Sequence, residues 1–374
     1  SSGGFFTDDI KKVAKLCHDN GVKAYLTLNT VMYDHDMQLL RIILHEVKRY
    51  GIDAVIASDF SVMQLCKEQG IPLHVSTQAN VSNLPAVQFF AALSDVIVLA
   101  RELTLQQVSD ITREIERKDI RGVSGDPLRV EVFIHGALCM AVSGKCYLSL
   151  HSQNASASRG ACVQNCRRPY LVSDAETGEQ LLIDNEYIMS PKDLCTIGVL
   201  DQVLKAGVDV LKIEGRSKGA DYVYTVTQCY KEAIAAIEEG RFTKDKIQDW
   251  EERMKAVYNR GFWEGYYLGH KTGEWTTHPG SAATQKKLYI GKGSRYYPNI
   301  KIGEFDIEAG SIKRGDTVML LGNAHGMVKE KLDRLVVNGE DMNEAVKGDK
   351  ITFPVGAKVT PGDKLYKLVD NDTA

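Results

Sequence analysis

Five cysteines between residues 139 and 195 are the side chains whose type and spacing could support chemistry. The first four follow the pattern C-x6-C-x15-C-x3-C, and the fifth comes after 28 intervening residues. Iron–sulfur clusters are held by four cysteine thiolates, whereas structural zinc sites usually contain two close C-x2-C pairs, which are missing here. We therefore expect an iron–sulfur site, with a zinc site and a metal-free stretch as the alternatives. The candidate ligands are Cys139, Cys146, Cys162, Cys166 and Cys195.

The residues around these cysteines are typical of a cofactor site. The apolar run VEVFIHGAL precedes Cys139, and the chain after Cys146 is rich in Gly, Ser and Asn. This pattern predicts a buried strand that opens into a long loop. The other cysteines, Cys17, Cys66 and Cys229, fall in helical patterns and are expected to be small buried hydrophobic residues.

Six β-rich runs alternate with helical patterns along the first two thirds of the chain. The expected strands lie at 23–30, 53–58, 72–80, 95–104, 129–136 and 208–216. The expected helices lie at 10–20, 36–50, 60–69, 85–93, 105–118, 190–206 and 222–239. Such alternation predicts βαβ units and a parallel sheet, and therefore an α/β fold.

A (β/α)8 TIM-like barrel is the favoured arrangement of these units. Polar residues follow the expected strands, and a barrel gathers the carboxyl ends of its strands around one mouth. No G-x-G-x-x-G follows a strand, which argues against a dinucleotide-binding sheet. Six strands are two short of eight and the chain starts at Ser rather than Met, so we expect the first βα unit or units to be missing.

Several charged and polar side chains at the expected strand ends are candidates for binding and catalysis. Arginine forks bind carboxylates in a bidentate way, so a small organic acid is an expected ligand; mutual neutralisation of the charges is the alternative. His135 follows a buried strand and is either a general acid/base or a core histidine. The candidates are Gln78, Asn80, Arg101, Glu102, His135, Lys212, Glu214 and Arg216.

The sequence pattern of the chain changes after about residue 276. Short β-rich runs separated by the turns KRGD, VKGD and TPGD predict a small antiparallel β-barrel. The expected organisation is a barrel domain at 1–257 with a cysteine-rich insertion at about 139–195, an aromatic linker at 258–275 and the small barrel at 276–374. The linker, YNRGFWEGYYLG, is expected to serve packing, with stacking on nucleotide bases as the alternative.

Composition narrows the class of protein. The chain is 44% hydrophobic with a formal net charge of −3, and it has no run long enough to span a membrane and no signal-peptide pattern. We expect a cytoplasmic protein in a reducing compartment, where clustered cysteines favour metal or redox chemistry. The chain contains neither a G-x-S-x-G nor an H-E-x-x-H motif, so neither of these motifs indicates a hydrolase.

Four motifs, EVFIHGALCMAVSGKCYLS, ACVQNCRRPY, SPKDLC and KIEGR, carry a resemblance to the collagenase-like peptidases of family U32. It extends over essentially the whole chain, although family members usually begin with one further βα unit. Better-understood members hydroxylate RNA or quinones: one branch makes 5-hydroxyuridine in tRNA with prephenate, another makes 5-hydroxycytidine in large-subunit ribosomal RNA, and ubiquinone hydroxylation factors carry a 4Fe–4S cluster. The length and NRGFWEGYYLG look most like the tRNA branch.

The resemblance implies roles for particular residues. Cys139, Cys146 and Cys162 match three cluster ligands, and Cys195 is the preferred fourth ligand with Cys166 as its rival. The group expected to hold a carboxylate co-substrate such as prephenate is Arg101, Glu214 and Arg216. The residues expected to meet RNA phosphates are Arg159, Arg167 and Arg168. The C-terminal barrel resembles the second domain of translation factors, which suits RNA docking.

The prediction is therefore an iron–sulfur-dependent RNA hydroxylase, most like the enzyme of tRNA wobble uridine. A peptidase, a ribosomal-RNA hydroxylase and a non-catalytic RNA-binding module are the alternatives. The expected partners are tRNA or another RNA, a small carboxylate and a ferredoxin-like electron donor, with no membrane. The cluster is expected to be lost on aerobic purification.

Overall fold

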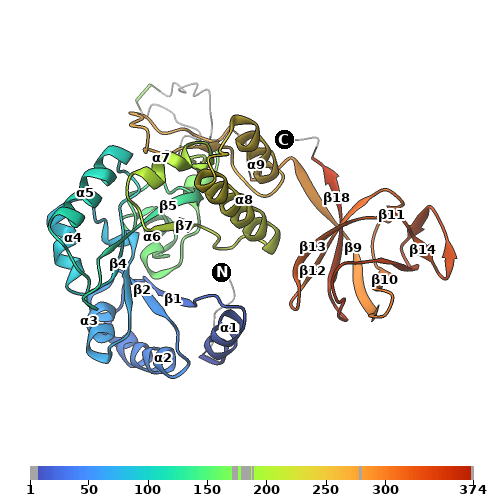
Figure 1. Cartoon of the computed structure of the whole chain (residues 1–374), viewed down its shortest axis with the longest axis horizontal. Coiled ribbons are helices and arrows are strands. Elements are labelled where there is room, and N and C mark those ends of the chain that lie inside the picture. Colours follow the sequence, from blue (N-terminus) through green and yellow to red (C-terminus); the bar gives the residue numbers. More distant parts are fainter. Residues whose placement is uncertain (1–6, 171–175, 178–186, 188, 278–279, 372–374) are drawn as a thin grey trace. The chain divides into compact units, whose positions relative to one another are not determined.

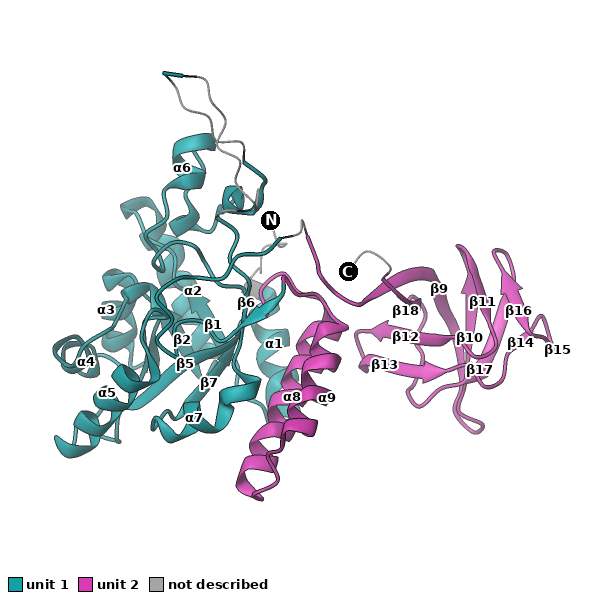
Figure 2. Ribbon diagram, turned by 90° about the horizontal axis from the view of Figure 1, so that it is seen from above, with its two compact units in different colours: residues 1–214, 261–279 teal, residues 215–260, 280–374 magenta. Residues whose placement is uncertain are grey.

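The structure is a computed structural model that describes residues 7–170, 176–177, 187, 189–277 and 280–371. It divides into two compact units, which Figure 2 colours separately. Unit 1 comprises Ser1–Glu214 and Gly261–Pro279, and unit 2 comprises Gly215–Arg260 and Gly280–Ala374. The predicted boundaries at 257 and 276 therefore need correction, because the helices after residue 215 belong with the C-terminal strands.

Unit 1 is built on a mainly parallel sheet, as the alternating pattern predicted. Its first five strands lie side by side in chain order, and β7 joins β5 in parallel. Most apolar side chains of β2, β3, β4 and β5 are buried, because helices cover such sheets, whereas those of β1 and β7 are not. The strands are β1 (Tyr25–Leu28), β2 (Ala54–Ala57), β3 (Leu73–Val75), β4 (Val96–Val98), β5 (Arg129–Gly136) and β7 (Val210–Ile213).

Helices connect these strands, and Figure 1 shows α3, α4 and α5 following one another around the sheet. Local capping fixes where they begin: Asp59 accepts a hydrogen bond from the backbone N–H of Ser61, and Thr104 forms a capping box with Gln107. The helices are α1 (Thr7–Asp19), α2 (Met37–Arg49), α3 (Phe60–Gln69), α4 (Leu84–Ala91) and α5 (Leu105–Arg117).

The helix predicted over 190–206 is wrong in its first half. The chain there forms a short strand, β6 (Asp193–Cys195), then η5 (Ile197–Val199) and only then α7 (Leu200–Lys205). Strand β6 pairs antiparallel with β5 and parallel with β8 (Phe262–Trp263). These two neighbours satisfy its backbone, so tertiary pairing overrides the local helix-start signal at 190–193.

The sheet of unit 1 is not closed by the strands that the structure describes. Strand β1 pairs with β2, and no described strand pairs with its other edge. None of its four residues is buried, whereas three of the four residues of β2 are. The parallel α/β sheet is thus confirmed, whereas a closed eight-stranded barrel is not.

Two aromatic rings of the linker pack within unit 1 and offer no surface on which a nucleotide base could stack. Trp263 and Tyr267 are buried, and the Tyr267 hydroxyl donates a hydrogen bond to the backbone oxygen of Phe133 at 2.6 Å. The expected packing between domains stays a prediction, but these two buried rings cannot stack on a base.

Unit 2 combines two helices with antiparallel strands, which confirms the β-rich C-terminal region. Phe305 and Phe353 stack at 4.7 Å in its core. The helices are α8 (Ala220–Glu238) and α9 (Lys244–Lys255). The strand order is β13-β12-β18-β9-β10-β17-β14-β15, with β11 paired to β16. The strands are β9 (Gln285–Tyr297), β10 (Ile302–Ile307), β11 (Ser311–Lys313), β12 (Thr317–Gly322), β13 (Gly326–Lys331), β14 (Val336–Val337), β15 (Glu340–Asp341), β16 (Glu344–Val346), β17 (Lys350–Pro354) and β18 (Lys364–Asp370).

Candidate active site

The cysteine-rich insertion leaves the sheet at the carboxyl end of β5, and its described part up to residue 170 contains short elements. These are α6 (Leu148–Gln153), η3 (Ala157–Arg159) and η4 (Asn165–Arg167). Cys139 and Cys162 are exposed, while Cys146 and Cys166 are half-buried. The insertion therefore presents its thiols from loops, as the Gly-, Ser- and Asn-rich sequence predicted.

Loops after two other strands hold the insertion in place. Asn80 ends η2 (Thr77–Ala79), which follows β3, with φ of 53°. Its side-chain amide donates a hydrogen bond to the backbone oxygen of Ser143 at 2.9 Å. In the loop after β1, the N–H of Val31 donates to the backbone oxygen of Ser158 at 3.0 Å. The insertion is thereby fixed over the carboxyl edge of the sheet.

Arg159 ties the insertion to the chain after β1. Its guanidinium makes two hydrogen bonds to the Asp36 carboxylate, at 2.6 and 3.2 Å, and a third to the backbone oxygen of Val31. It also lies 4.1 Å from the centre of the Tyr33 ring. The hydrogen bond from Arg159 lowers the pKa of Asp36 to about 2. Arg159 therefore has a structural role inside the protein, which the sequence analysis did not predict.

Arg167 also acts inside the protein. It donates hydrogen bonds to the backbone oxygens of Leu138 and Pro191, both at 2.5 Å, and to the hydroxyl of Ser190 at 2.9 Å. These contacts join the start of the insertion to the segment before β6. The contact of these three arginines with RNA phosphates stays a prediction: Arg159 and Arg167 already bind other parts of the protein, whereas Arg168 is exposed.

The thiol of Cys166 interacts electrostatically with the thiols of the three other insertion cysteines. Burial raises the pKa of the Cys166 thiol, and the Arg167 guanidinium opposes this shift. Further contributions that raise this pKa come from the thiols of Cys139, Cys162 and Cys146. Such contributions fall off with distance, so the Cys166 thiol lies within electrostatic range of the other three thiols.

An iron–sulfur cluster at these cysteines stays a prediction from the sequence. In the described part of the chain, no three His, Cys, Asp or Glu side chains are grouped so that they could hold one metal ion. A four-iron cluster binds each thiolate at a different iron, so its ligands stand further apart than those of one zinc ion. The four cysteines of the insertion match such a cluster in number and type.

Cys195 lies in a different setting from the four insertion cysteines. It is buried in β6, where its backbone pairs with His135 of β5. The sequence predicted that Cys195 lies near the start of a helix, whereas the structure places it in a strand.

Arg101 lies between the strand ends and the insertion. Its side chain follows β4, donates a hydrogen bond to the backbone oxygen of Ala137 at 3.0 Å and lies 3.7 Å from the centre of the Phe133 ring. Burial lowers the pKa of Arg101, while the negative charges of Glu214 and Cys139 oppose this effect. Arg101 is therefore a partly desolvated cation near both a carboxylate and a candidate cluster ligand.

Buried polar atoms without partners cluster on the same loops. Among the described residues, Gln78 Oε1, Asn80 Oδ1 and Arg101 Nε are buried and have no hydrogen-bond partner. A buried polar atom without a partner costs about 1–3 kcal/mol, so native proteins rarely leave several unsatisfied. All three belong to residues predicted to bind a substrate, and they are atoms that a polar ligand would satisfy.

The remaining candidates at the strand ends differ in their surroundings. His135 is almost fully buried, and its ring packs against Phe262. The N–H of Glu214 donates a hydrogen bond to the backbone oxygen of His135 at 2.9 Å, which places Glu214 beside β5. Glu102 is exposed, and Arg216 is exposed in unit 2.

Lys212 belongs to a buried charged cluster that the sequence analysis did not identify. Its amine pairs with the Glu131 carboxylate at 2.6 Å, and the other oxygen of Glu131 lies 3.9 Å from Nδ1 of His74. The ring of Tyr25 packs edge-on against His74 at 4.7 Å. Lys212 therefore forms an internal ion pair, and its contact with a substrate stays a prediction. A carboxylate inside the apolar run RVEVFIHG was the signal that could have revealed it.

This cluster makes stability depend on pH. Burial lowers the pKa of His74 to about 4, and Lys212 adds to the effect. An unfolded histidine titrates near pH 6.5, so between these values the unfolded chain binds a proton that the folded chain does not. The free energy of unfolding should therefore fall as pH drops from about 6.5 to about 4, by up to about 3 kcal/mol.

Urea unfolding at pH values across this window would measure the effect. His74→Gln should flatten the pH dependence, whereas His45→Gln, at an exposed position on α2, should leave it unchanged. An equal pH dependence in wild type and His74→Gln would contradict the assignment.

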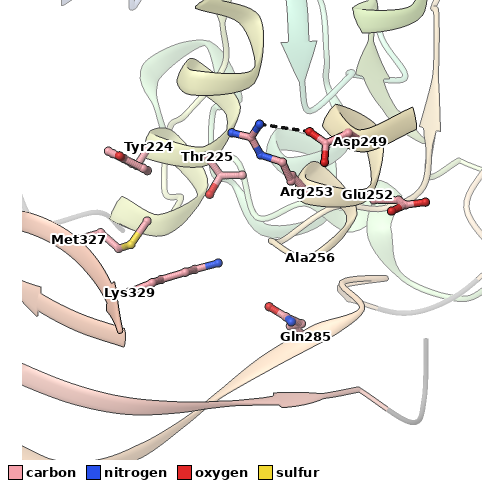
Figure 3. Close-up of a pocket in the computed structure, with 9 residues that line it drawn as sticks. All are labelled: Tyr224, Thr225, Asp249, Glu252, Arg253, Ala256, Gln285, Met327 and Lys329. Atoms are coloured by element: carbon pink, nitrogen blue, oxygen red, sulfur yellow. Dashed lines mark hydrogen bonds and ion pairs between the residues drawn. The ribbon is translucent and has the colours of Figure 1, made fainter. Parts of the chain in front are cut away.

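Unit 2 contains a separate pocket of about 410 Å³, shown in Figure 3. Its charged residues have mixed signs, and Arg253 is already bound by Glu232 at 2.5 and 2.9 Å and by Asp249 at 3.4 Å. Burial lowers the pKa of Lys329. The pocket has no thiol in its lining and offers a less distinctive chemistry than the insertion. Its lining is Tyr224, Thr225, Asp249, Glu252, Arg253, Ala256, Gln285, Met327 and Lys329.

No described helix is both long and apolar enough to cross a membrane.

Known proteins resemble this chain along most of its length. The model of peptidase family U32 matches residues 1–277. A protein of Porphyromonas gingivalis named collagenase is 49% identical over 98% of this chain and 89% of its own length. A protein of Helicobacter pylori named tRNA hydroxylation protein P is 30% identical over 71% of this chain and 62% of its own length. An Escherichia coli protein named 23S rRNA 5-hydroxycytidine synthase is 29% identical over 97% of this chain and 50% of its own length.

Proposed function

This chain belongs to peptidase family U32, and from that premise we propose that it is an iron–sulfur-dependent RNA hydroxylase. The proposed substrate is the wobble uridine of tRNA, the product is 5-hydroxyuridine, and a small carboxylate such as prephenate is the co-substrate. The observation that carries this proposal is an insertion with four cysteines, which hydrogen bonds fix over a sheet edge. At that edge, Gln78, Asn80 and Arg101 have buried polar atoms without hydrogen-bond partners among the described residues. Relatives named for tRNA and rRNA hydroxylation support it.

Cys139, Cys146, Cys162 and Cys166 would hold the cluster. Support for Cys166 comes from the electrostatic proximity of its thiol to the other three. The cluster would supply a site at which a small oxygen donor is bound or activated. Arg167 helps to fix the loops that carry the thiols, because it joins Leu138 to Pro191.

The co-substrate would lie beside Arg101. A carboxylate there would gain a charge-assisted hydrogen bond from Nε, which lacks a partner among the described residues. Glu214 raises the pKa of Arg101 and so keeps the guanidinium charged despite its burial. Gln78 and Asn80 would contact polar groups of the ligand or of an unstacked base. The loops of unit 1 would then act as the mouth of a TIM-like barrel.

Nucleoside analysis tests the proposal directly. In a strain that lacks the gene, 5-hydroxyuridine and its derivatives should be missing from digested tRNA. Wild-type protein should restore them, Cys146→Ala should not, and Cys17→Ala on α1 is the matched control that should. Mass spectrometry of tRNA and rRNA digests would separate the tRNA substrate from a ribosomal one. If the modified nucleosides of tRNA and rRNA were the same in the deletion strain and the wild type, the proposal would be wrong.

A peptidase is the second candidate, because relatives at 49% and 46% identity are named collagenase. A cysteine nucleophile requires a lowered pKa, whereas burial raises the pKa of Cys166. Gelatin cleavage by purified protein, retained after removal of iron and in Cys146→Ala, would favour the peptidase. Absence of cleavage by protein that restores tRNA hydroxylation would favour the hydroxylase.

A further inference from the structure

The thiol insertion lies in a stretch of chain that lacks carboxylates. Residues 132–173 contain no Asp or Glu, although these two types account for 49 of the 374 residues. The same stretch has four basic side chains, of which Lys145 and Arg168 are exposed. Exposed cations on a segment that contributes no anions of its own attract a polyanion.

Tyr147 is the most exposed aromatic side chain of this stretch. It directly follows Cys146 and Lys145, and 73% of it is exposed, more than any other large apolar or aromatic residue that the structure describes. Its backbone oxygen accepts a hydrogen bond from the N–H of His151 at 2.8 Å. The ring therefore projects into solvent from a backbone that the first turn of α6 fixes.

Helix α6 itself is anchored to the segment that carries Cys162 and Cys166. Ser149 is buried, and its hydroxyl accepts a hydrogen bond from the N–H of Val163 at 3.1 Å. The side-chain amide of Asn165, also buried, donates to the hydroxyl of Ser152 at 2.5 Å. A ring on such an anchored helix loses little conformational freedom when it binds, which favours stacking.

We propose that Tyr147 is a positioning residue that stacks on an unpaired base of the bound RNA, beside the thiols, while Lys145 and Arg168 contact the adjacent phosphates. This inference rests on the proposed function and names its RNA-binding surface. Flat aromatic faces next to basic side chains are the combination that binds single-stranded nucleic acid, because every base has a face on which a ring can stack. Paired bases are already stacked within a helix, so the partner is a loop.

Fluorescence anisotropy with a labelled anticodon stem–loop RNA tests the contact over a range of salt concentrations. Tyr147→Ala should weaken binding about 10-fold and leave the slope of log affinity against log salt unchanged, because stacking releases no counterions. Tyr147→Phe should bind like wild type. Lys145→Ala should weaken binding and reduce the salt slope by about one.

Two controls separate the contact from unfolding and from cluster loss. Phe89→Ala removes another exposed aromatic residue, on α4 of the same unit, and should bind RNA like wild type. A fully paired duplex of the same length should bind wild type and Tyr147→Ala equally. Iron content should be the same in all variants.

The outcomes distinguish this inference from the function on which it rests. Wild-type affinity of Tyr147→Ala, in a protein that binds the stem–loop and hydroxylates tRNA, would overturn only the role of Tyr147. A wild-type protein that neither binds RNA nor restores the hydroxylated nucleoside would overturn both. Binding of a protein electron donor that is lost in Tyr147→Ala, with RNA affinity unchanged, would assign the surface to that partner instead.

Discussion

Replacing Cys166 with alanine is expected to abolish cluster binding, whereas replacing Cys195 with alanine should preserve it. The thiol of Cys166 interacts electrostatically with those of Cys139, Cys162 and Cys146, while Cys195 is buried in β6. Loss of one thiolate from a four-cysteine site leaves an iron without its protein ligand.

Iron and acid-labile sulfide per chain, measured on anaerobically purified protein, would check this result. Wild type and Cys195→Ala should each contain about four irons and four sulfides, with the broad visible absorbance of a 4Fe–4S centre. Cys17→Ala should match them, and Cys166→Ala should fall well below. The reverse order, with iron lost from Cys195→Ala and kept in Cys166→Ala, would restore the ligand set favoured by the sequence. One zinc per wild-type chain and no iron would replace the cluster with a different metal site.

Replacing Lys212 with methionine is expected to destabilise unit 1 by about 3–5 kcal/mol, because removal of one partner of a buried ion pair leaves an uncompensated charge. Glu131 is only 4% exposed, and the Lys212 amine at 2.6 Å is its ion-pair partner. His74, the other neighbour of Glu131, has a pKa lowered to about 4 and is neutral at pH 7, so it cannot replace the lysine charge.

Urea unfolding at neutral pH would measure the loss, with attention to whether the two units unfold in separate transitions. Lys205→Met is the matched control, because Lys205 forms an exposed pair with Asp201 on α7 at 3.0 Å. Exposed pairs contribute about 0–1 kcal/mol, so this control should change stability little. The double variant Glu131→Gln with Lys212→Met should recover part of the loss. A Lys212→Met variant as stable as Lys205→Met would show that Glu131 is not left unpaired in this way.

Local sequence was sufficient to predict the framework. The six strands from β1 to β5 and β7 coincide with the predicted apolar runs, and most of the preceding helices were located correctly. Both follow from periodicity and from turn and cap residues, which act over a few neighbouring positions. The antiparallel character of the C-terminal strands was readable for the same reason. The thiol-rich insertion was also visible, because four cysteines in a Gly- and Ser-rich stretch are unusual in any core.

Contacts between distant segments decided the rest. Residues 193–195 form a strand because β5 and β8 pair with them, although their local signal favours a helix. Arg159 and Arg167 look like phosphate ligands in the sequence, yet Asp36 and the backbone of Leu138 and Pro191 occupy their donors. Lys212 likewise pairs with Glu131, which lies 81 positions earlier in the chain. Side-chain type sets what a residue can bind, but only the tertiary structure decides whether the partner is another part of the protein or is left for a ligand, because burial and distance are properties of the folded chain.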